Sequence, residues 1–304
     1  MIEEKRFAVL IDADNVSAKY IKYILDELTS YGVATYKRIY GDWTKPSSVS
    51  WKDILLENSV TPVQQYSYTV GKNATDSAMI IDAMDILYSG NVEGFCIVSS
   101  DSDFTKLASR LRESGMLIVG MGERKTPKPF IAACNQFKYL DVLAETDKKS
   151  MEIEENHIKN DINKDKGKKV AAKKDKEAEA EAAKTVKSPV VPENSDNGKN
   201  MTDLSVIKSA IIKMMNEVDE EDQRMNMGEL GSRLVKRYPD FDVRNYGDTK
   251  LSKFLKKFDF LEINSNGKGG SSMWVSLKSN IEQQPEVKTQ SVERKRRRTY
   301  RKKN

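Results

Sequence analysis

The chain has 304 residues, of which 32% are charged and 38% hydrophobic, and its formal net charge is +5 at pH 7. This length predicts about two domains, and the high share of charge predicts segments outside any packed core. Two cysteines and one histidine argue against a zinc cluster, a disulfide framework and Cys–His or Ser–His–Asp catalysis, and no apolar run is long enough to span a membrane.

The first part of the chain, up to about residue 143, alternates between short apolar runs and amphipathic segments. The runs expected to form strands are 7–15, 33–40, 61–66, 94–100 and 116–122, and the expected helices are 17–30, 48–58, 74–89 and 103–114. The first run is continuously apolar, which is typical of a parallel strand buried on both faces. We therefore expect an α/β domain over residues 1–146 with a doubly wound parallel sheet, whose site lies at the carboxyl ends of its strands.

Residues 147–202 are rich in Lys, Glu, Asp, Ala and Asn, which predicts a charged flexible linker. Helical patterns then occur at 204–218, 227–238 and 249–258, followed by two strand-like runs around a Gly-Lys-Gly-Gly turn. Three helices followed by a hairpin predict a small winged helix-turn-helix domain over residues 203–279.

The basic excess of the chain lies in its last residues. Residues 283–304 hold nine Lys and Arg against two Asp and Glu, whereas residues 1–146 hold 16 against 19. We expect residues 280–304 to form a disordered tail that attracts polyphosphate such as RNA. A solvated terminus with no dedicated partner is the alternative interpretation.

Acidic residues recur where the predicted strands end. Asp12, Asp14 and Asn15 close the first strand, and Asp101 and Asp103 follow the fourth. A carboxylate at Asp12 ends an apolar run and needs a cation or several hydrogen-bond donors. For Asp14, Asn15 and one residue of the 99–103 segment, helix capping is the alternative role.

A further acid lies on a predicted helix. Asp76 falls at the centre of the apolar face of 74–89, where an unpaired carboxylate is costly to bury, so we expect either a metal or Lys72, one turn earlier, beside it. Capping of the helix N-terminus is the alternative role for Asp76. Asp82 lies at the edge of that face and Asp85 opposite to it. Oxygen ligands without sulfur or imidazole favour Mg²⁺ or Mn²⁺, and such a site suits phosphodiester hydrolysis by metal-activated water.

These segments together resemble the NYN domain, in its bacterial LabA-like branch. The resemblance rests on Asp12-x-x-Asn15, Lys72-x-x-x-Asp76, the Ser-x-Asp-Ser-Asp-Phe segment at 99–104 and the Phe-x-x-Ala-Cys-Asn-x-Phe segment at 130–137. It implies a PIN-like, Mg²⁺-dependent ribonuclease fold with a metal and water site formed by Asp12, Asn15, Asp76, Asp101 and Asp103. The expected metal ligands are Asp12, Asp76, Asp101 and Asp103. Lys72 is an expected RNA contact, and Asp82 is expected to have a peripheral role in the site.

The second domain resembles the OST-HTH/LOTUS domain. The similarity rests on Met-Gly-Glu-Leu-Gly at 227–231, Tyr-Pro-Asp-Phe at 238–241, Arg244-x-Tyr-Gly and Lys250-Leu-Ser. Members of that family are RNA-associated winged helices, some of which dock protein partners. Arg244, Lys250 and Lys253 are the expected RNA contacts, with Lys256 and Lys257 beside them.

The leading hypothesis is therefore a cytoplasmic, metal-dependent endoribonuclease whose C-terminal module recruits RNA or a protein partner. A non-catalytic RNA-binding regulator with an NYN fold is the alternative. An aspartate-nucleophile phosphatase is a third possibility, but the Thr or Val expected after Asp14 in that chemistry is absent.

Overall fold

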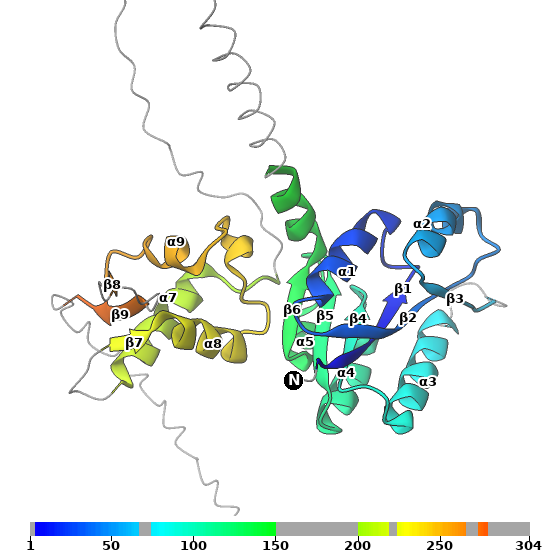
Figure 1. Ribbon diagram of the computed structural model, residues 1–304, viewed down its shortest axis with the longest axis horizontal. Helices are drawn as coiled ribbons and strands as arrows, with labels where there is room; N and C mark the ends of the chain where they lie inside the picture. Colours follow the sequence, from blue (N-terminus) through cyan, green and yellow to red (C-terminus); the bar gives the residue numbers. More distant parts are fainter. Residues whose placement is uncertain (1–3, 67–73, 150–199, 219–223, 266–272, 279–304) are drawn as a thin grey trace, which may run out of the picture.

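The computed structural model describes residues 4–66, 74–149, 200–218, 224–265 and 273–278, which form two bodies, one from each half of the chain (Figure 1). Most of the expected linker and the whole expected basic tail lie outside the described residues.

The N-terminal body is built on a six-stranded parallel sheet. Its strands are β1 (Arg6–Asp12), β2 (Val33–Gly41), β3 (Thr61–Gln64), β4 (Gly94–Val98), β5 (Leu117–Gly122) and β6 (Gln136–Tyr139). Their order across the sheet is β3-β2-β1-β4-β5-β6, so the chain winds outward from β1 to β3, returns to the centre at β4 and winds outward again. This confirms the doubly wound sheet and places the switch point between β1 and β4.

Helices cover both faces of this sheet. They are α1 (Ile21–Leu28), α2 (Lys52–Glu57), α3 (Ala74–Ser89), α4 (Thr105–Glu113) and α5 (Lys128–Ala133), with short 3-10 turns η1 (Ala18–Tyr20), η2 (Pro46–Trp51) and η3 (Ser102–Phe104). Residues 140–149 form a further helix.

Strand β1 shows how the two apolar cores arise. Ala8 and Leu10 point into a core with α3, α4 and α5, whereas Phe7, Val9 and Ile11 point into a core with α1, α2 and part of 140–149. Because successive side chains of a strand point to opposite faces, a strand covered on both sides must be apolar throughout. The continuous apolar run read from the sequence has this cause.

Three elements of this body were missed by the sequence pattern, namely α5, β6 and the helix over residues 140–149. Strand β6 is four residues long and includes Gln136 and Lys138, so it has no apolar run. Its register against β5, from Val119 opposite Gln136 to Gly122 opposite Tyr139, comes from backbone pairing at the edge of the sheet and not from a side-chain pattern.

The C-terminal body is a small winged-helix domain, as expected. It contains α7 (Leu204–Asn216), β7 (Arg224–Asn226), α8 (Met227–Arg237), η4 (Val243–Tyr246), α9 (Leu251–Leu255), β8 (Leu261–Ser265) and β9 (Met273–Leu277). The three strands pair antiparallel in the order β7-β9-β8. Helix α9 is shorter than the expected segment because the chain turns after Leu255 to bury Phe258 and Leu261. Across the described parts of both bodies, no helix has both the length and the apolarity needed to cross a membrane.

Candidate metal centre

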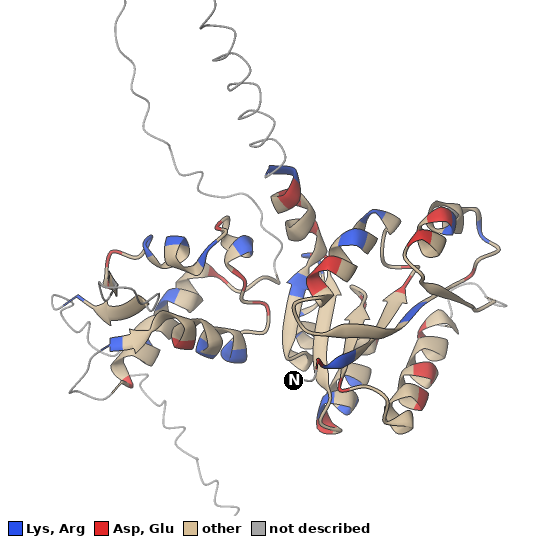
Figure 2. Ribbon diagram, viewed as in Figure 1, with Lys and Arg blue, Asp and Glu red and all other residues tan. Residues whose placement is uncertain are grey.

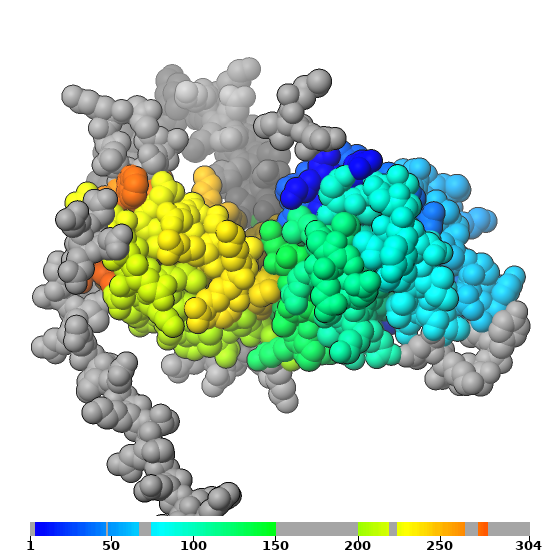
Figure 3. Space-filling view, turned by 90° about the horizontal axis from the view of Figure 1, so that it is seen from below, coloured from blue at the N-terminus to red at the C-terminus, as the bar shows by residue number. Residues whose placement is uncertain are grey.

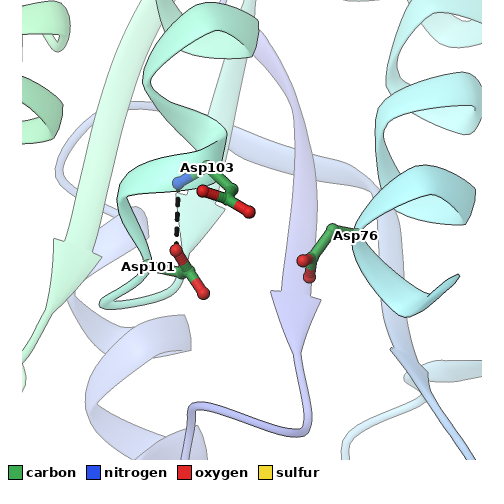
Figure 4. Close-up of side chains that lie close together, drawn as sticks. All are labelled: Asp76, Asp101 and Asp103. Atoms are coloured by element: carbon green, nitrogen blue, oxygen red, sulfur yellow. Dashed lines mark hydrogen bonds between the residues drawn. The ribbon is translucent and has the colours of Figure 1, made fainter. Parts of the chain in front are cut away.

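Three carboxylates meet at the switch point of the sheet. Asp76 lies in the first turn of α3, and Asp101 and Asp103 lie in the turn that follows β4. One oxygen from each can be chosen so that all three lie within 4.8 Å of one another. Figure 4 shows the three side chains facing a common space between α3 and η3.

The turn after β4 is held by its own hydrogen bonds. The Asp101 carboxylate caps η3 by accepting from the Asp103 backbone N–H at 3.0 Å, and the Asp101 N–H donates to Ser99 Oγ at 3.1 Å. These bonds fix the backbone on both sides of Ser102, so the two acids project from one short turn. The capping role expected for one residue of this segment therefore belongs to Asp101, which also lies in the acidic trio.

The acidic trio, Asp76, Asp101 and Asp103, is electrostatically strained. Burial raises the pKa of Asp76, and the charges of Asp12, Asp101 and Asp103 raise it further, to about 6. A carboxylate in such a place is stabilised by a cation, which offsets both the lost hydration and the mutual repulsion. The donor set, made of carboxylate oxygens with neither sulfur nor imidazole, fits a hard divalent cation.

This strain predicts a pH-dependent effect of Asp76→Asn in the metal-free protein. Folding raises the pKa of this carboxyl from 3.8 to about 6, so the penalty for its ionisation grows across that pH interval and is complete above it. We expect the substitution to raise the free energy of unfolding by about 1 kcal/mol at pH 7.5, discounted for partial exposure, and by much less near pH 4. Urea unfolding with a chelator at both pH values tests this, and an equal effect at both would contradict it.

Asp12 lies beside the trio without joining it. Its side chain is 0% exposed, and its two oxygens accept from the Asp14 N–H at 3.0 Å, Asn15 Nδ2 at 2.8 Å and Ser99 Oγ at 2.7 Å. Burial raises the pKa of Asp12, and these hydrogen bonds act in the opposite direction. The structure thus supplies the several donors that a buried carboxylate needs, and its assignment as a metal ligand stays a prediction.

Ser99 is a site residue that sequence reasoning did not assign. It is fully buried, and its hydroxyl donates to Asp12 while accepting from the Asp101 N–H. It therefore connects the end of β1 to the turn that carries two acids of the trio. A Cβ added at Gly122 would lie 2.6 Å from the Ser99 carbonyl oxygen, so β5 packs tightly against this turn.

A second group of polar side chains borders the trio. Asp14 accepts a hydrogen bond from Thr75 Oγ1 at 2.9 Å, and Lys45 Nζ lies 3.9 Å from its other oxygen. Thr75 is the residue before Asp76, so this bond ties the start of α3 to the turn after β1. Lys45 carried no signal in the sequence, because it belongs to the loop between β2 and η2 and reaches the site through the fold.

The remaining acids of α3 lie apart from the trio. Asp82 pairs with Arg38 and accepts from the Tyr40 hydroxyl, both on β2, which explains its place at the edge of the apolar face. Asp85 is exposed. Lys72 lies outside the described residues.

In the winged-helix domain, the expected RNA contacts have different surroundings. Lys250 and Lys253 are exposed at the start of α9. Arg244 instead forms ion pairs with Asp242 at 2.7 Å and with Glu27 of α1 at 2.8 Å. Two of the three basic candidates are therefore open to solvent, whereas the third is held by carboxylates.

The fold and the comparisons agree on the class of the protein. A six-stranded parallel sheet flanked by helices fits the PIN-like α/β class. Residues 6–141 match the family model of the NYN domain, and residues 202–273 match that of the OST-HTH/LOTUS domain. The chain therefore carries an NYN domain followed by an OST-HTH/LOTUS domain, which confirms both resemblances.

No curated protein matches the chain. Among solved structures, a protein of unknown function from Vibrio parahaemolyticus is similar, with 18% sequence identity and a TM-score of 0.38, over 46% of this chain and 94% of that one.

Proposed function

We propose that this protein is a divalent-metal-dependent endoribonuclease, in which the NYN domain cleaves RNA and the OST-HTH domain binds RNA or a protein partner. The observation that carries the proposal is the acidic trio at the switch point, where α/β sheets place their ligands. The NYN domain points to the PIN-like nuclease superfamily, and the OST-HTH domain points to RNA binding.

The proposed cofactor is Mg²⁺ or Mn²⁺, held by Asp76, Asp101 and Asp103 with Asp12 beside them. A bound divalent ion supplies Lewis-acid activation of water and of the phosphate. The chain's own contribution is to position the ligands: the cap on η3 holds Asp101 and Asp103, and α3 presents Asp76 from the other side.

Asp12, Asn15 and Ser99 form the proposed support of this site. The Asn15 amide donates to Asp12 at 2.8 Å and the Ser99 hydroxyl donates at 2.7 Å, so the Asp12 carboxylate cannot rotate without breaking both. In this arrangement the Ser99–Asp12 hydrogen bond joins the end of β1 to the turn after β4, and Asn15 holds the Asp12 carboxylate from the turn after β1. Asp12 and Asn15 therefore belong to the proposed catalytic site together with Asp76, Asp101 and Asp103.

The proposed RNA contacts are the exposed Lys250 and Lys253 of the OST-HTH domain, together with Lys72, which lies outside the described residues. Lys45 joins them because its ammonium lies beside Asp14 at the rim of the site. The proposed domains are 1–146 for the nuclease, 147–202 for the linker, 203–279 for the OST-HTH domain and 280–304 for a basic tail.

The proposal is tested by incubating the purified protein with internally labelled RNA and with Mg²⁺, Mn²⁺ or excess chelator. We expect short RNA oligonucleotides with either metal and none with chelator, and no product from Asp103→Ala. RNA affinity is measured separately in chelator by fluorescence anisotropy. Tight RNA binding without cleavage under any metal would refute the nuclease and favour the non-catalytic regulator.

A further inference from the structure

Arg244 belongs to a group of four charged side chains that lies between the two domains. Glu27 and Lys138 come from the NYN domain, and Asp242 and Arg244 come from the OST-HTH domain. Lys138 Nζ lies 2.6 Å from Asp242 and 3.3 Å from Glu27, and the Arg244 guanidinium donates to both oxygens of Glu27 at 2.8 and 2.9 Å. Figure 2 shows acidic and basic residues on both sides of this boundary.

The four charges are largely removed from water. The exposed fractions of their side chains are 12% for Glu27, 13% for Lys138, 11% for Asp242 and 27% for Arg244. Two acids and two bases balance each other, so no uncompensated charge is buried. Burial acts against ionisation of Glu27, but its hydrogen bond to Arg244 and the charge of Lys138 lower its pKa overall. Because each acid pairs with both bases, removing one member would leave the buried group with one uncompensated charge.

Backbone and apolar contacts surround this group. The Phe137 N–H, on the edge strand β6, donates to the Pro239 carbonyl at 2.7 Å, so the OST-HTH chain satisfies a donor at the open edge of the NYN sheet. The Tyr139 hydroxyl donates to Asp240 at 3.2 Å. Met201, just before the OST-HTH helices, packs against the core that α3, α4 and α5 share.

The carboxylate of Asp240 connects strand β6 of the NYN domain to the start of the OST-HTH domain. It is 3% exposed and accepts from Thr202 N–H at 2.8 Å and Thr202 Oγ1 at 2.7 Å as well as from Tyr139. The start of the OST-HTH domain is thereby fixed to the same carboxylate as β6. In the space-filling view of Figure 3, the two domains meet along a continuous boundary.

We propose that the OST-HTH domain docks on the β6 edge of its own NYN domain in solution, through the segment 239–244, and that Arg244 is a docking residue and not an RNA contact. Segment 239–244 binds two features of the NYN domain of the same chain, namely the carboxylate of Glu27 and the backbone of β6. Docking holds the exposed Lys250 and Lys253 in a fixed position relative to the acidic trio. This inference is independent of nuclease activity.

The test uses the full chain with a specific protease site placed between residues 170 and 180. After cutting, both halves keep their own apolar cores, so co-migration on size exclusion reports docking alone. We expect the wild-type halves to co-migrate at about 50 µM. Arg244→Glu and Lys138→Glu change the interface from opposite sides. Each should raise the dissociation constant of the two halves, measured by titrating one labelled half with the other, at least ~30-fold.

Lys213→Glu is the matched control because it makes the same charge change at an exposed lysine. Lys213 lies near the C-terminal end of α7. Its halves should co-migrate like the wild type. Circular dichroism of each separated half checks that it remains folded. Separation of the wild-type halves on cutting, or an unchanged dissociation constant for the folded Arg244→Glu halves, would overturn the proposal.

Discussion

Asp76→Asn is expected to lower the rate of metal-dependent RNA cleavage at least ~100-fold while the protein remains folded. The amide keeps the shape of the side chain but removes one of the three negative charges that face a common space. Because those charges are the attraction for a divalent cation, Mn²⁺ affinity should fall together with the cleavage rate. Cleavage assays and calorimetric titration with Mn²⁺ measure the two effects separately.

Asp85→Asn is the matched control for this experiment. It makes the same chemical change nine residues later on the same helix, where the side chain is exposed, and it should cleave RNA at the wild-type rate. A folded Asp76→Asn protein with unchanged cleavage would remove Asp76 from the site. Loss of cleavage with unchanged Mn²⁺ affinity would separate its chemical role from metal binding.

Asp12→Ala is expected to lower the free energy of unfolding by about 2–4 kcal/mol. The substitution leaves the Ser99 hydroxyl and the Asn15 amide without their acceptor, and Ser99 is fully buried. Nothing of the removed carboxylate was exposed, so water does not replace it easily. Urea unfolding in chelator measures this effect without any contribution from a bound metal.

Asp103→Ala provides the comparison for Asp12. Its side chain is exposed and belongs to the acidic trio, so we expect lost cleavage with a stability change below about 1 kcal/mol. The pair distinguishes a residue that holds the site together from one that faces the cation. Equal stability of the two variants would contradict the supporting role of Asp12.

The sequence predicted the sheet because the physical cause of its pattern is local. A strand interior buried on both faces is apolar in succession, and residues 7–11 of β1 and the whole of β4 satisfy this condition. Strand β6 contains polar residues at alternate positions, because it lies at the edge of the sheet and pairs on one side with β5. Its existence depends on backbone hydrogen bonds with distant residues, which leave no periodicity in the sequence.

The acidic trio was also predictable, since a carboxylate placed among apolar residues has few structural explanations. This argument predicts Asp76, whereas Asp101 and Asp103 are predicted because they follow a strand at the carboxyl edge of the sheet. The resemblance to the NYN domain implies all three, and the structure brings them together. Ser99 and Lys45 were not found, because a serine or a lysine in a loop is common and costs nothing in water. Their roles follow from the neighbours that the fold gives them.

Arg244 shows the limit of local reasoning most clearly. Its position beside a polar turn of a winged helix indicates an exposed cation, and its own domain offers Asp242 as a neighbour. Its second partner, Glu27, lies 217 residues away in the chain. The sequence by itself determined the two folds and the acids at the switch point, because burial and strand alternation act over a few residues. Only the tertiary structure decided which charges are paired, because an ion pair depends on distance in space and not on separation along the chain.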